Sequence, residues 1–318
     1  MRVLLTGRTG FVGGVLHDKL LNEGHDVYSL VRHVAGRYKY LPDEKNLIFG
    51  ELRDFARIKQ IMDELRPDAV INLAAMTAVS LSFSNPMDFW ESTASGTINL
   101  AECARSNDRL KLFIHASTSE IYGAQQRFPL KEEYPYNPTS PYAVAKVADE
   151  YYLHMLGMVY NFPFVIMRPF NTYGRTGIKH YVVERAITTL LEKGEVQLWN
   201  PASIRDFLYC EDHAEGYIAA LNNAQPNETY NLATGRGISI REMVDIVCRE
   251  VQEQFGIDPK VNWGLPEDRP YELKVLIGDN TKALRQLKWE PKVQLEEGIK
   301  RTVEAWGKIL GTPNMGLA

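Results

Sequence analysis

Short apolar runs alternate with segments of helical periodicity through the first half of the chain. The apolar runs lie at residues 3–5, 26–31, 47–49, 69–73 and 112–115. Between them, apolar residues recur at helical spacing near residues 16–21, 58–65 and 87–105. Such an alternation is typical of a parallel sheet that is covered by helices on both faces. The pattern therefore predicts an α/β fold with a Rossmann-type, doubly wound parallel sheet.

The second half of the chain is less regular. Residues 164–171 are predicted to form another core strand, and residues 204–209 are predicted to return to the main sheet. A helical segment is expected from Lys179 and His180 toward Leu191, and two amphipathic helices are expected after residue 239. These elements indicate a smaller, C-terminal mixed α/β lobe beside the sheet.

A glycine-rich turn lies between the first apolar run and the first helical segment. Gly7, Gly10 and Gly13 recur at a spacing of three residues. In a strand–turn–helix unit the first glycine permits the tight turn, the second lets the backbone approach a pyrophosphate, and the third lets the helix pack closely on the strand. The free N–H groups at the helix start favour the negative charge of phosphates. We therefore predict a dinucleotide site with contacts from Gly7, Thr9, Gly10, Phe11, Val12 and Gly13.

The end of the second strand decides which dinucleotide is expected. An NAD-selective site normally places an Asp or Glu there for the ribose hydroxyl. This chain has Val31 at that position, followed by Arg32. No carboxylate is expected here to repel a 2′-phosphate, and a guanidinium can pair with one. The sequence therefore predicts NADP, with NAD as the alternative.

Other strand ends are expected at the same edge of the sheet, which is where ligands bind in this architecture. Two small residues, Ala74 and Ala75, follow the fourth strand and leave room for a ligand. The strand-end residues expected to contact the cofactor are Glu51, Leu52, Leu73, Ala74, Ala75, Ser117 and Pro169.

A tyrosine and a lysine share one face of a predicted helix beside this edge. Ser140 and Pro141 are typical of a helix start, and Tyr142 and Lys146 lie one helical turn apart. A free tyrosine titrates at about pH 10, so a neighbouring cation is needed to favour the phenolate at neutral pH. Together with the glycine turn, the pair indicates a tyrosine base and a lysine that lowers its pKa. Both side chains are expected to contact the cofactor as well.

Composition limits the partners that the chain can have. Of its 318 residues, 45% are hydrophobic and 24% are charged, as in globular proteins with a sizeable core. The net charge of −4 argues against a nucleic-acid partner, and no apolar stretch is long enough to cross a membrane. Three widely separated cysteines predict neither a disulfide framework nor a metal site. We expect a cytoplasmic protein without a bound metal.

Several motifs occur together in the order of one known family. They are the glycine turn, residues 73–75, residues 117–123, Tyr142 with Lys146, residues 168–171 and residues 205–207. On these motifs the whole chain resembles the extended short-chain dehydrogenases/reductases that act on nucleotide-diphosphate sugars. Within that class it is most similar to GDP-mannose 4,6-dehydratases and the related 4-keto-6-deoxymannose reductases, through residues 116–120, 140–146, 269–272 and 276–279. Residues 93–97 and 171–175 depart from the usual family pattern.

The resemblance implies chemistry on the sugar of a nucleotide-diphosphate sugar. Tyr142 takes the proton of the 4-hydroxyl, Thr118 hydrogen-bonds the same oxygen, and hydride leaves C4 for the cofactor. Glu120 then removes the C5 proton while the C6 hydroxyl departs, and hydride returns to C6. This is a 4,6-dehydratase, with a GDP-mannose-like substrate favoured. A 4-keto-6-deoxy-sugar reductase, a 4-epimerase and a UDP-glucuronate-type decarboxylase are the alternatives, because reductases and decarboxylases of the class also carry a Glu in this motif.

Substrate contacts are expected from both halves of the chain. A guanidinium fork matches a diphosphate, which makes Arg205 and Arg269 candidates for that group. The full set of expected substrate contacts is Thr77, Thr118, Ser119, Glu120, Asn171, Lys179, Arg205 and Arg269.

Domain organisation and assembly complete the prediction. The NADP-binding domain comprises residues 1–170 and also receives about 204–235, and the nucleotide-sugar-binding lobe comprises residues 171–203 and 236–318. The helices near 87–104 and after Tyr142 are apolar on more than one side, and such helices need a partner beyond their own sheet. We expect a homodimer or a higher homo-oligomer, in which the resemblance implies two helices from each subunit at the interface.

Overall fold

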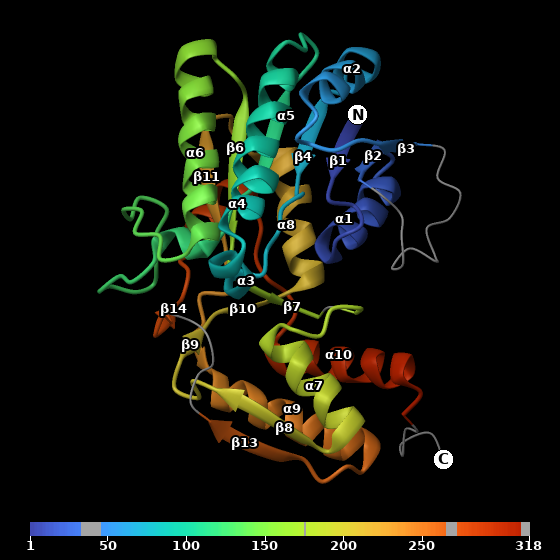
Figure 1. The fold of residues 1–318 in the computed structure, drawn as a ribbon, viewed down its shortest axis with the longest axis vertical. Coiled ribbons are helices and arrows are strands. Elements are labelled where there is room, and N and C mark those ends of the chain that lie inside the picture. The colour runs from blue at the N-terminus through green and yellow to red at the C-terminus, as the bar shows by residue number, and fades with distance from the viewer. Residues whose placement is uncertain (33–45, 175, 265–271, 313–318) are drawn as a thin grey trace.

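The main sheet organises the chain. In a computed structural model, which describes residues 1–32, 46–174, 176–264 and 272–312, seven parallel strands lie in the order β11-β6-β5-β4-β1-β2-β3 (Figure 1). Their bounds are β1 (Arg2–Thr6), β2 (Asp26–Val31), β3 (Leu47–Phe49), β4 (Ala69–Asn72), β5 (Leu112–Ala116), β6 (Phe164–Pro169) and β11 (Glu228–Leu232). The strand order reverses between β1 and β4, as in doubly wound sheets that bind ligands at that point. The predicted Rossmann-type fold is confirmed.

Each face of the sheet has its own hydrophobic core, because successive side chains of a strand point to opposite faces. In β1, Val3 and Leu5 pack in the core that includes α1 (Phe11–Asn22) and α8 (Cys210–Asn223). Leu4, between them, packs in the core on the other face. That core is covered by α2 (Phe55–Leu65), α5 (Gly96–Arg105) and α6 (Pro141–Tyr160). Burial on both faces explains why the sequence shows continuous apolar runs instead of alternation.

The predicted helix over 87–105 is present, but it is interrupted. It consists of α4 (Pro86–Trp90), a π-helical turn η1 (Glu91–Ser95) and α5, and it is preceded by α3 (Val79–Ser84). Gly96 follows the π-helical turn, where an added Cβ would lie 3.0 Å from the Cβ of Leu52. This close approach explains a glycine inside a helix.

The lobe has a separate hydrophobic core below the sheet (Figure 1). It contains α7 (Val182–Lys193), α9 (Ile240–Phe255) and α10 (Leu295–Leu310), packed with the parallel pair β8 (Glu195–Trp199) and β13 (Lys260–Gly264). In α9, Ser239 and Glu242 form a capping box, which fixes where the helix begins. The two amphipathic helices expected after residue 239 are therefore confirmed as α9 and α10.

The prediction that residues 204–209 return to the main sheet is wrong. The short strand β9 (Ile204–Arg205) lies between β12 (Ile238–Ser239) and β14 (Val275–Leu276) in one small sheet. The short strand β10 (Phe207–Tyr209) pairs with β7 (Asn171–Tyr173) in another. The edge of the main sheet is formed by β11 instead. Between β9 and β10, the buried Asp206 carboxylate accepts hydrogen bonds from the Thr234 hydroxyl at 2.6 Å and the Gly235 N–H at 3.0 Å. These bonds hold the segment at the junction between sheet and lobe.

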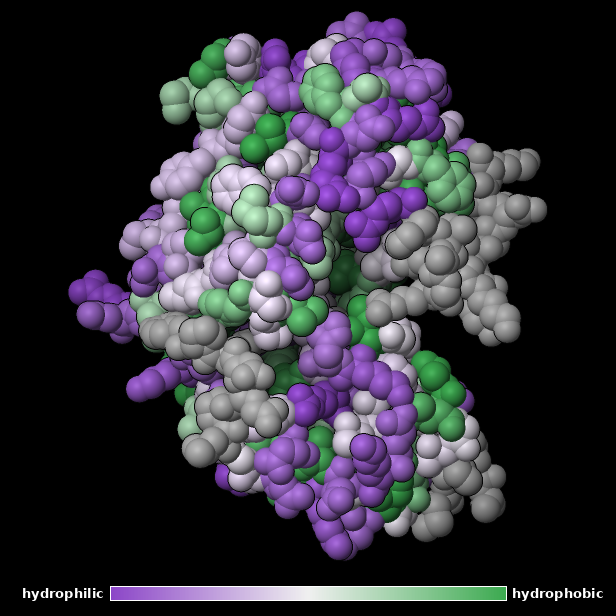
Figure 2. All heavy atoms as spheres, viewed as in Figure 1, coloured by the Kyte–Doolittle hydropathy of each residue, from purple (hydrophilic) through white to green (hydrophobic). Residues whose placement is uncertain are grey.

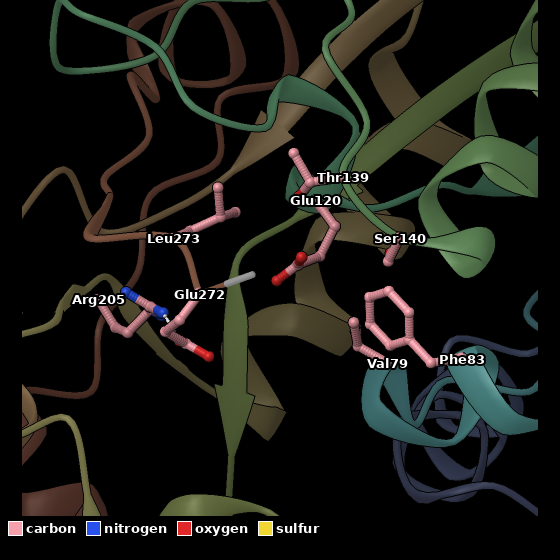
Figure 3. Close-up of a pocket in the computed structure, with 8 residues that line it drawn as sticks. All are labelled: Val79, Phe83, Glu120, Thr139, Ser140, Arg205, Glu272 and Leu273. Atoms are coloured by element: carbon pink, nitrogen blue, oxygen red, sulfur yellow. Dashed lines mark hydrogen bonds and ion pairs between the residues drawn. The ribbon is translucent and has the colours of Figure 1, made fainter. Parts of the chain in front are cut away.

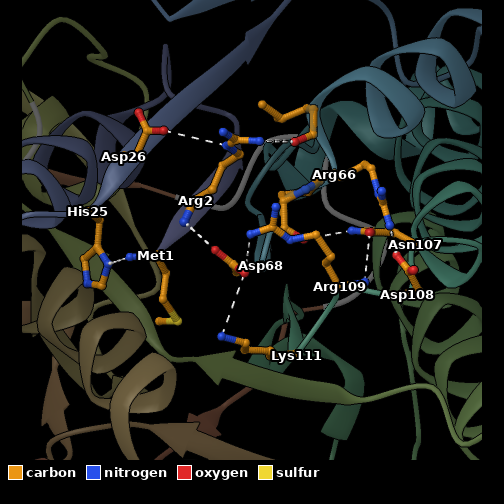
Figure 4. A network of polar contacts seen from close by, with 12 residues as sticks. Met1, Arg2, His25, Asp26, Arg66, Asp68, Asn107, Asp108, Arg109 and Lys111 are labelled. Carbon is orange, nitrogen blue, oxygen red and sulfur yellow. Dashed lines mark hydrogen bonds and ion pairs between the residues drawn. The ribbon is translucent and has the colours of Figure 1, made fainter.

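Ionic contacts tie together the strand starts at the opposite edge of the sheet (Figure 4). The Arg2 N–H at the start of β1 donates to the Asp68 carboxylate at 2.8 Å. The Arg109 guanidinium lies 3.4 Å and the Lys111 ammonium 3.8 Å from the same carboxylate. Since Asp68 precedes β4 and Lys111 precedes β5, one carboxylate links three neighbouring strands.

Two further features concern partners. Within the described ranges, none of the helices is long and apolar enough to cross a membrane. The described residues also contain no cluster of His, Cys, Asp or Glu suited to a metal ion.

Candidate functional site

The glycine turn joins β1 to α1 at the carboxyl edge of the sheet. Gly7 has a positive φ of 73°, and an added Cβ would lie 2.8 Å from the carbonyl carbon of Leu73. A Cβ on Gly13 would lie 2.1 Å from the Gly7 oxygen. Gly10 caps α1, which starts at Phe11, without a side-chain hydrogen bond. The turn therefore presents backbone at the start of a helix, which suits a pyrophosphate.

The neighbouring strand ends are held against this turn. The Ala74 N–H donates to the Thr6 hydroxyl at 3.1 Å, which keeps the segment after β4 beside Gly7. Leu52 is buried in the core under α2 and α5, so its side chain serves packing. Ser117, after β5, donates its hydroxyl to the buried Glu150 carboxylate.

Arg32 has a carboxylate neighbour that the sequence did not reveal. The parallel register pairs Val31 with Phe49, which places the segment after β3 beside Arg32. There the Glu51 carboxylate lies 3.5 Å from the Arg32 guanidinium and 3.6 Å from that of Arg53. The expectation that no carboxylate lies at this position is therefore wrong, and the adjacent strand provides one.

Tyr142 lies on the first turn of α6, over the end of β5. Ser140 caps this helix by accepting a hydrogen bond from the Ala143 N–H at 3.1 Å, and Pro141 occupies the first position, as predicted. Tyr142 is buried, and the Thr118 hydroxyl lies close enough to affect the pKa of its phenol. Burial raises the pKa of Tyr142, and the Thr118 hydroxyl acts against that rise. Tyrosine and threonine hydroxyls thus meet at one point of the site.

Lys146 is buried one turn further along α6. Its ammonium donates to the Ala116 carbonyl at 2.6 Å and lies 3.5 Å from the Asp149 carboxylate. Burial lowers the pKa of Lys146, and Asp149 opposes that shift. The protein groups that act on the Tyr142 pKa raise it on balance, which differs from the predicted lowering by Lys146. A cation at the nicotinamide position would have to supply the missing effect.

Glu120 extends from the short helix η2 (Ser119–Tyr122) into a cavity between the sheet domain and the lobe (Figure 3). The lining residues are Val79, Phe83, Glu120, Thr139, Ser140, Arg205, Glu272 and Leu273. Its carboxylate points between the apolar wall of Val79 and Phe83 and the ion pair of Arg205 with Glu272. The surface is hollowed between the two parts of the molecule, and hydrophobic side chains lie in the hollow (Figure 2). A carboxylate thus faces an enclosed space next to Thr118 and Tyr142.

Comparison with known proteins identifies the family of this arrangement. A sequence model described as GDP-mannose 4,6 dehydratase matches residues 4–302. The chain belongs to this family. It is an enzyme of the extended short-chain dehydrogenases/reductases that modify nucleotide sugars with a nicotinamide cofactor.

Relatives within the family differ in the reaction that they catalyse. UDP-glucose 4-epimerase of Mycolicibacterium smegmatis is 31% identical, with 96% of this chain and 98% of that protein covered. The solved structure of UDP-glucose 4-epimerase from Thermotoga maritima with UDP-glucose has a TM-score of 0.90 at 30% identity, covering 98% of this chain and 100% of that chain. The dTDP-glucose 4,6-dehydratase of Streptomyces venezuelae, solved with NAD, has a TM-score of 0.86 at 26% identity and covers 97% of each chain.

Only some of the residues predicted to contact the substrate lie together at the cavity. Thr118, Ser119, Glu120 and Arg205 lie at or beside the cavity. The Oδ1 atom of Asn171 is buried without a hydrogen-bond partner among the described residues. Pro169 ends β6 next to it.

Other substrate candidates lie elsewhere or are not described. Lys179 forms an ion pair with Glu192 and lies 5.8 Å from the ring centre of Trp306, so its contacts are with the lobe. Arg269 lies outside the described residues. Thr77 is exposed, and its hydroxyl lies 2.6 Å from that of Tyr181.

Several residues at or beside the cavity were not predicted from the sequence. Tyr181 precedes α7 and acts on the pKa of Tyr142, so the two phenols are close. Glu272 pairs with Arg205 from a segment 67 residues away. Val79 and Phe83 come from the short helix α3. The sequence does not identify these residues as site residues, because they come from separate loops and short helices that are brought together only by folding.

Proposed function

We propose that this enzyme is a nucleotide-diphosphate-sugar 4,6-dehydratase. The observation that carries the proposal is the Glu120 carboxylate, which points into the cavity two residues after Thr118. Elimination across C5 and C6 needs a base at C5, whereas C4 oxidation alone does not. A positioned acid–base group contributes about 10²–10⁴-fold to a rate.

Tyr142 and Thr118 serve the oxidation at C4. Thr118 lies close enough to Tyr142 to act on its pKa, so the 4-hydroxyl of a sugar beside both can give its proton to Tyr142 and keep a hydrogen bond to Thr118. The glycine turn and Ala74, whose backbones meet at the start of α1, fit a dinucleotide. Bound nicotinamide supplies the hydride acceptor and a positive charge near the phenol. Lys146 holds its ribose.

Glu120 acts after oxidation. A 4-ketone acidifies the C5 hydrogen, and Glu120 removes that proton and passes it to the C6 hydroxyl, which leaves as water. The hydride would then return to C6, with the proton held by Tyr142 returning to C5, so that the reaction has no net redox change. Ser140 and Thr139, which share the cavity lining, lie where polar groups of the sugar are expected.

Arg205 is the proposed partner of the diphosphate. Its side chain is buried and ion-paired with Glu272, which occupies the position that an anion would take. Substrate therefore competes with Glu272 for the guanidinium. The Oδ1 atom of Asn171 is buried without a partner among the described residues, so we propose it as a further contact for the substrate, because an unpaired buried acceptor is costly.

A 4-epimerase is the second candidate, since the M. smegmatis and T. maritima relatives carry that name. Epimerisation needs Thr118 and Tyr142 but no base at C5, so the role of Glu120 separates the two reactions. A GDP-mannose-like substrate stays the favoured type on the family match, and NADP stays the favoured cofactor on Arg32.

We further propose that the enzyme works as a homodimer. Apolar side chains are exposed on α4 and α6, including Met87 at 64%, Tyr151 at 60% and Met158 at 84%. A groove between these helices is lined by Met87, Trp90, Pro141 and Val144. A continuous apolar face of this kind is typical of a protein interface.

One assay tests the proposed reaction. Purified enzyme is incubated with NADP⁺ or NAD⁺ and with GDP-, UDP-, CDP- and dTDP-sugars in turn, and the products are analysed by mass spectrometry. Loss of one water supports dehydration. Loss of carbon dioxide supports a decarboxylase, and an isomer of unchanged mass supports an epimerase.

A further inference from the structure

A buried polar chain lies beneath Lys146 and leads away from the catalytic cavity. Lys146 on α6 contacts Asp149 on the same helix and His115 on β5, and all three are at most 2% exposed. The Nε2 atom of His115 lies 3.2 Å from the Oδ2 atom of Asp149. Beyond His115 the chain continues to Asn72 at the end of β4.

Asn72 determines which nitrogen of His115 carries the proton. The Thr6 hydroxyl donates to the Asn72 Oδ1 atom at 2.6 Å, so the Asn72 amide group faces the other side. That amide lies 3.1 Å from the Thr97 hydroxyl and 3.3 Å from the Nδ1 atom of His115. Nδ1 therefore accepts a hydrogen bond, and Nε2 carries the hydrogen that faces Asp149.

Asp149 is a buried carboxylate, and Lys146 is the neighbour that can compensate its negative charge. Its side chain is 0% exposed, and neither of its carboxylate oxygens has a hydrogen-bond partner in the described part of the chain, although His115 and Lys146 lie within ion-pair distance of Oδ2. Burial lowers the pKa of His115, so the imidazole is neutral and leaves Lys146 as the positive neighbour. Burying a carboxylate is costly unless its charge is compensated. The cost of burying both charged groups suggests that the ion pair of Asp149 with Lys146 serves the function of the enzyme.

We propose that Asp149 is a positioning residue that keeps the buried Lys146 protonated and directed toward the cofactor site, with the neutral His115 beside the carboxylate. This rests on the proposed role of Lys146 and does not depend on which sugar reaction follows. The groups that face Lys146 are His115 and the Ala116 carbonyl from β5, and Asp149 and Glu150 from α6. Of these, Asp149 lies closest among the carboxylates that oppose the effect of burial.

The charge state of Lys146 can be measured directly. Enzyme labelled with [ε-¹³C]lysine is titrated by NMR, and the Lys146 signal is assigned by its loss in Lys146→Arg. The wild-type signal is expected to remain that of an ammonium through neutral pH. In Asp149→Asn the titration midpoint is expected to fall by about 1–3 pH units, the usual effect of an opposite charge at this distance. Asp149→Glu is expected to restore most of the midpoint.

A matched control separates charge from packing. Asp212 on α8 is a similarly buried aspartate that accepts a hydrogen bond from the Val293 N–H at 2.8 Å. Asp212→Asn is expected to lower stability and leave the Lys146 midpoint unchanged. An unchanged midpoint in Asp149→Asn would overturn the proposal. If that variant does not fold, a wild-type Lys146 that is already neutral at pH 7 would overturn it equally.

Cofactor binding gives a second readout. If Lys146 must be charged to hold the cofactor, Asp149→Asn should bind NADP⁺ with near wild-type affinity at low pH and lose affinity as pH rises through the lowered midpoint. A purely structural defect would weaken binding by the same factor at every pH, and that result would count against the proposal.

Discussion

The Glu51 carboxylate lies 3.5 Å from the Arg32 guanidinium, where the ends of β3 and β2 meet. Arg32 is 57% exposed on its side chain and Glu51 is 29% exposed. A 2′-phosphate of NADP would compete with Glu51 for this arginine, whereas the ribose hydroxyls of NAD would find an acceptor in Glu51.

This pair makes the cofactor preference testable. We predict that the enzyme binds NADP⁺ more tightly than NAD⁺, because a charge-assisted contact contributes about 1.5–3 kcal/mol, or about tenfold and more in Kd. Arg32→Ala should remove the preference, and Glu51→Gln should increase it. Titrations of both cofactors measure this. Equal affinities in the wild type would refute the predicted preference, and a preference that survives Arg32→Ala would show that Arg32 is not its source.

The ion pair between Arg205 and Glu272 predicts a gain of affinity on mutation. Glu272→Gln removes the charge of one carboxylate that competes with a diphosphate for this guanidinium, so GDP, UDP and dTDP should bind more tightly, by about 1 kcal/mol or roughly fivefold. Arg205→Gln should weaken all three. Glu228→Gln, which breaks an ion pair with Lys282 at 2.7 Å, is the matched control and should change nothing. Weaker binding in Glu272→Gln would mean that Glu272 contacts the ligand itself.

The apolar face on α4 and α6 predicts the assembly state. Met87 is 64% exposed in the monomer, so Met87→Glu should leave the subunit folded and disrupt a dimer formed through this face. Light scattering at micromolar concentration should give twice the 36.2 kDa of one chain for the wild type and one chain for the variant. Ile309→Glu alters a residue that is 55% exposed on α10 and should remain dimeric. A wild-type mass of one chain would refute the assignment.

Asp68 predicts how stability depends on pH. The hydrogen bond from the Arg2 N–H is the main reason why the pKa of Asp68 is lowered. A lowered pKa contributes stability above the unfolded value of about 3.9, and this contribution is lost as pH falls through the folded value. Asp68→Asn should therefore reduce the free energy of unfolding by about 1–2 kcal/mol at pH 7 and by less at low pH. Denaturation across pH measures this, with the exposed Asp245→Asn on α9 as control; a deficit that persists at low pH would contradict the account.

The sequence predicted the elements whose signals are local. Apolar runs such as 69–73 predicted strands because both faces of the sheet are covered, and the glycine spacing from Gly7 predicted the turn because its backbone allows no Cβ. Residues 204–209 were misplaced because strands of two or three residues carry too little pattern to distinguish one sheet from another.

The parts of the site that the sequence did not predict depend on neighbours across space. Glu51 reaches Arg32 through the register of β2 with β3, which a single strand does not encode. Lys146 lies one turn from Tyr142, as the spacing requires, but β5 and Asp149 determine where its ammonium points. Tyr181 and Glu272 join the site from loops of the lobe.

Glu120 separates dehydration from the oxidation that precedes it. Tyr142→Phe should abolish both steps, because the buried phenol is the proposed base for the 4-hydroxyl. Burial raises the pKa of Tyr142, so the phenolate fraction, and with it the oxidation rate, should grow as pH rises toward that pKa.

The most direct measurement is single-turnover kinetics of Glu120→Gln with the sugar nucleotide that the wild type converts. Glutamine keeps the shape of the side chain but cannot accept a proton. We predict that reduced cofactor still forms, seen by its absorbance, while formation of the 4-keto-6-deoxy product falls by about 10²–10⁴-fold. Dehydration by Glu120→Gln at the wild-type rate, or a wild type that releases no water from any sugar nucleotide, would contradict the account.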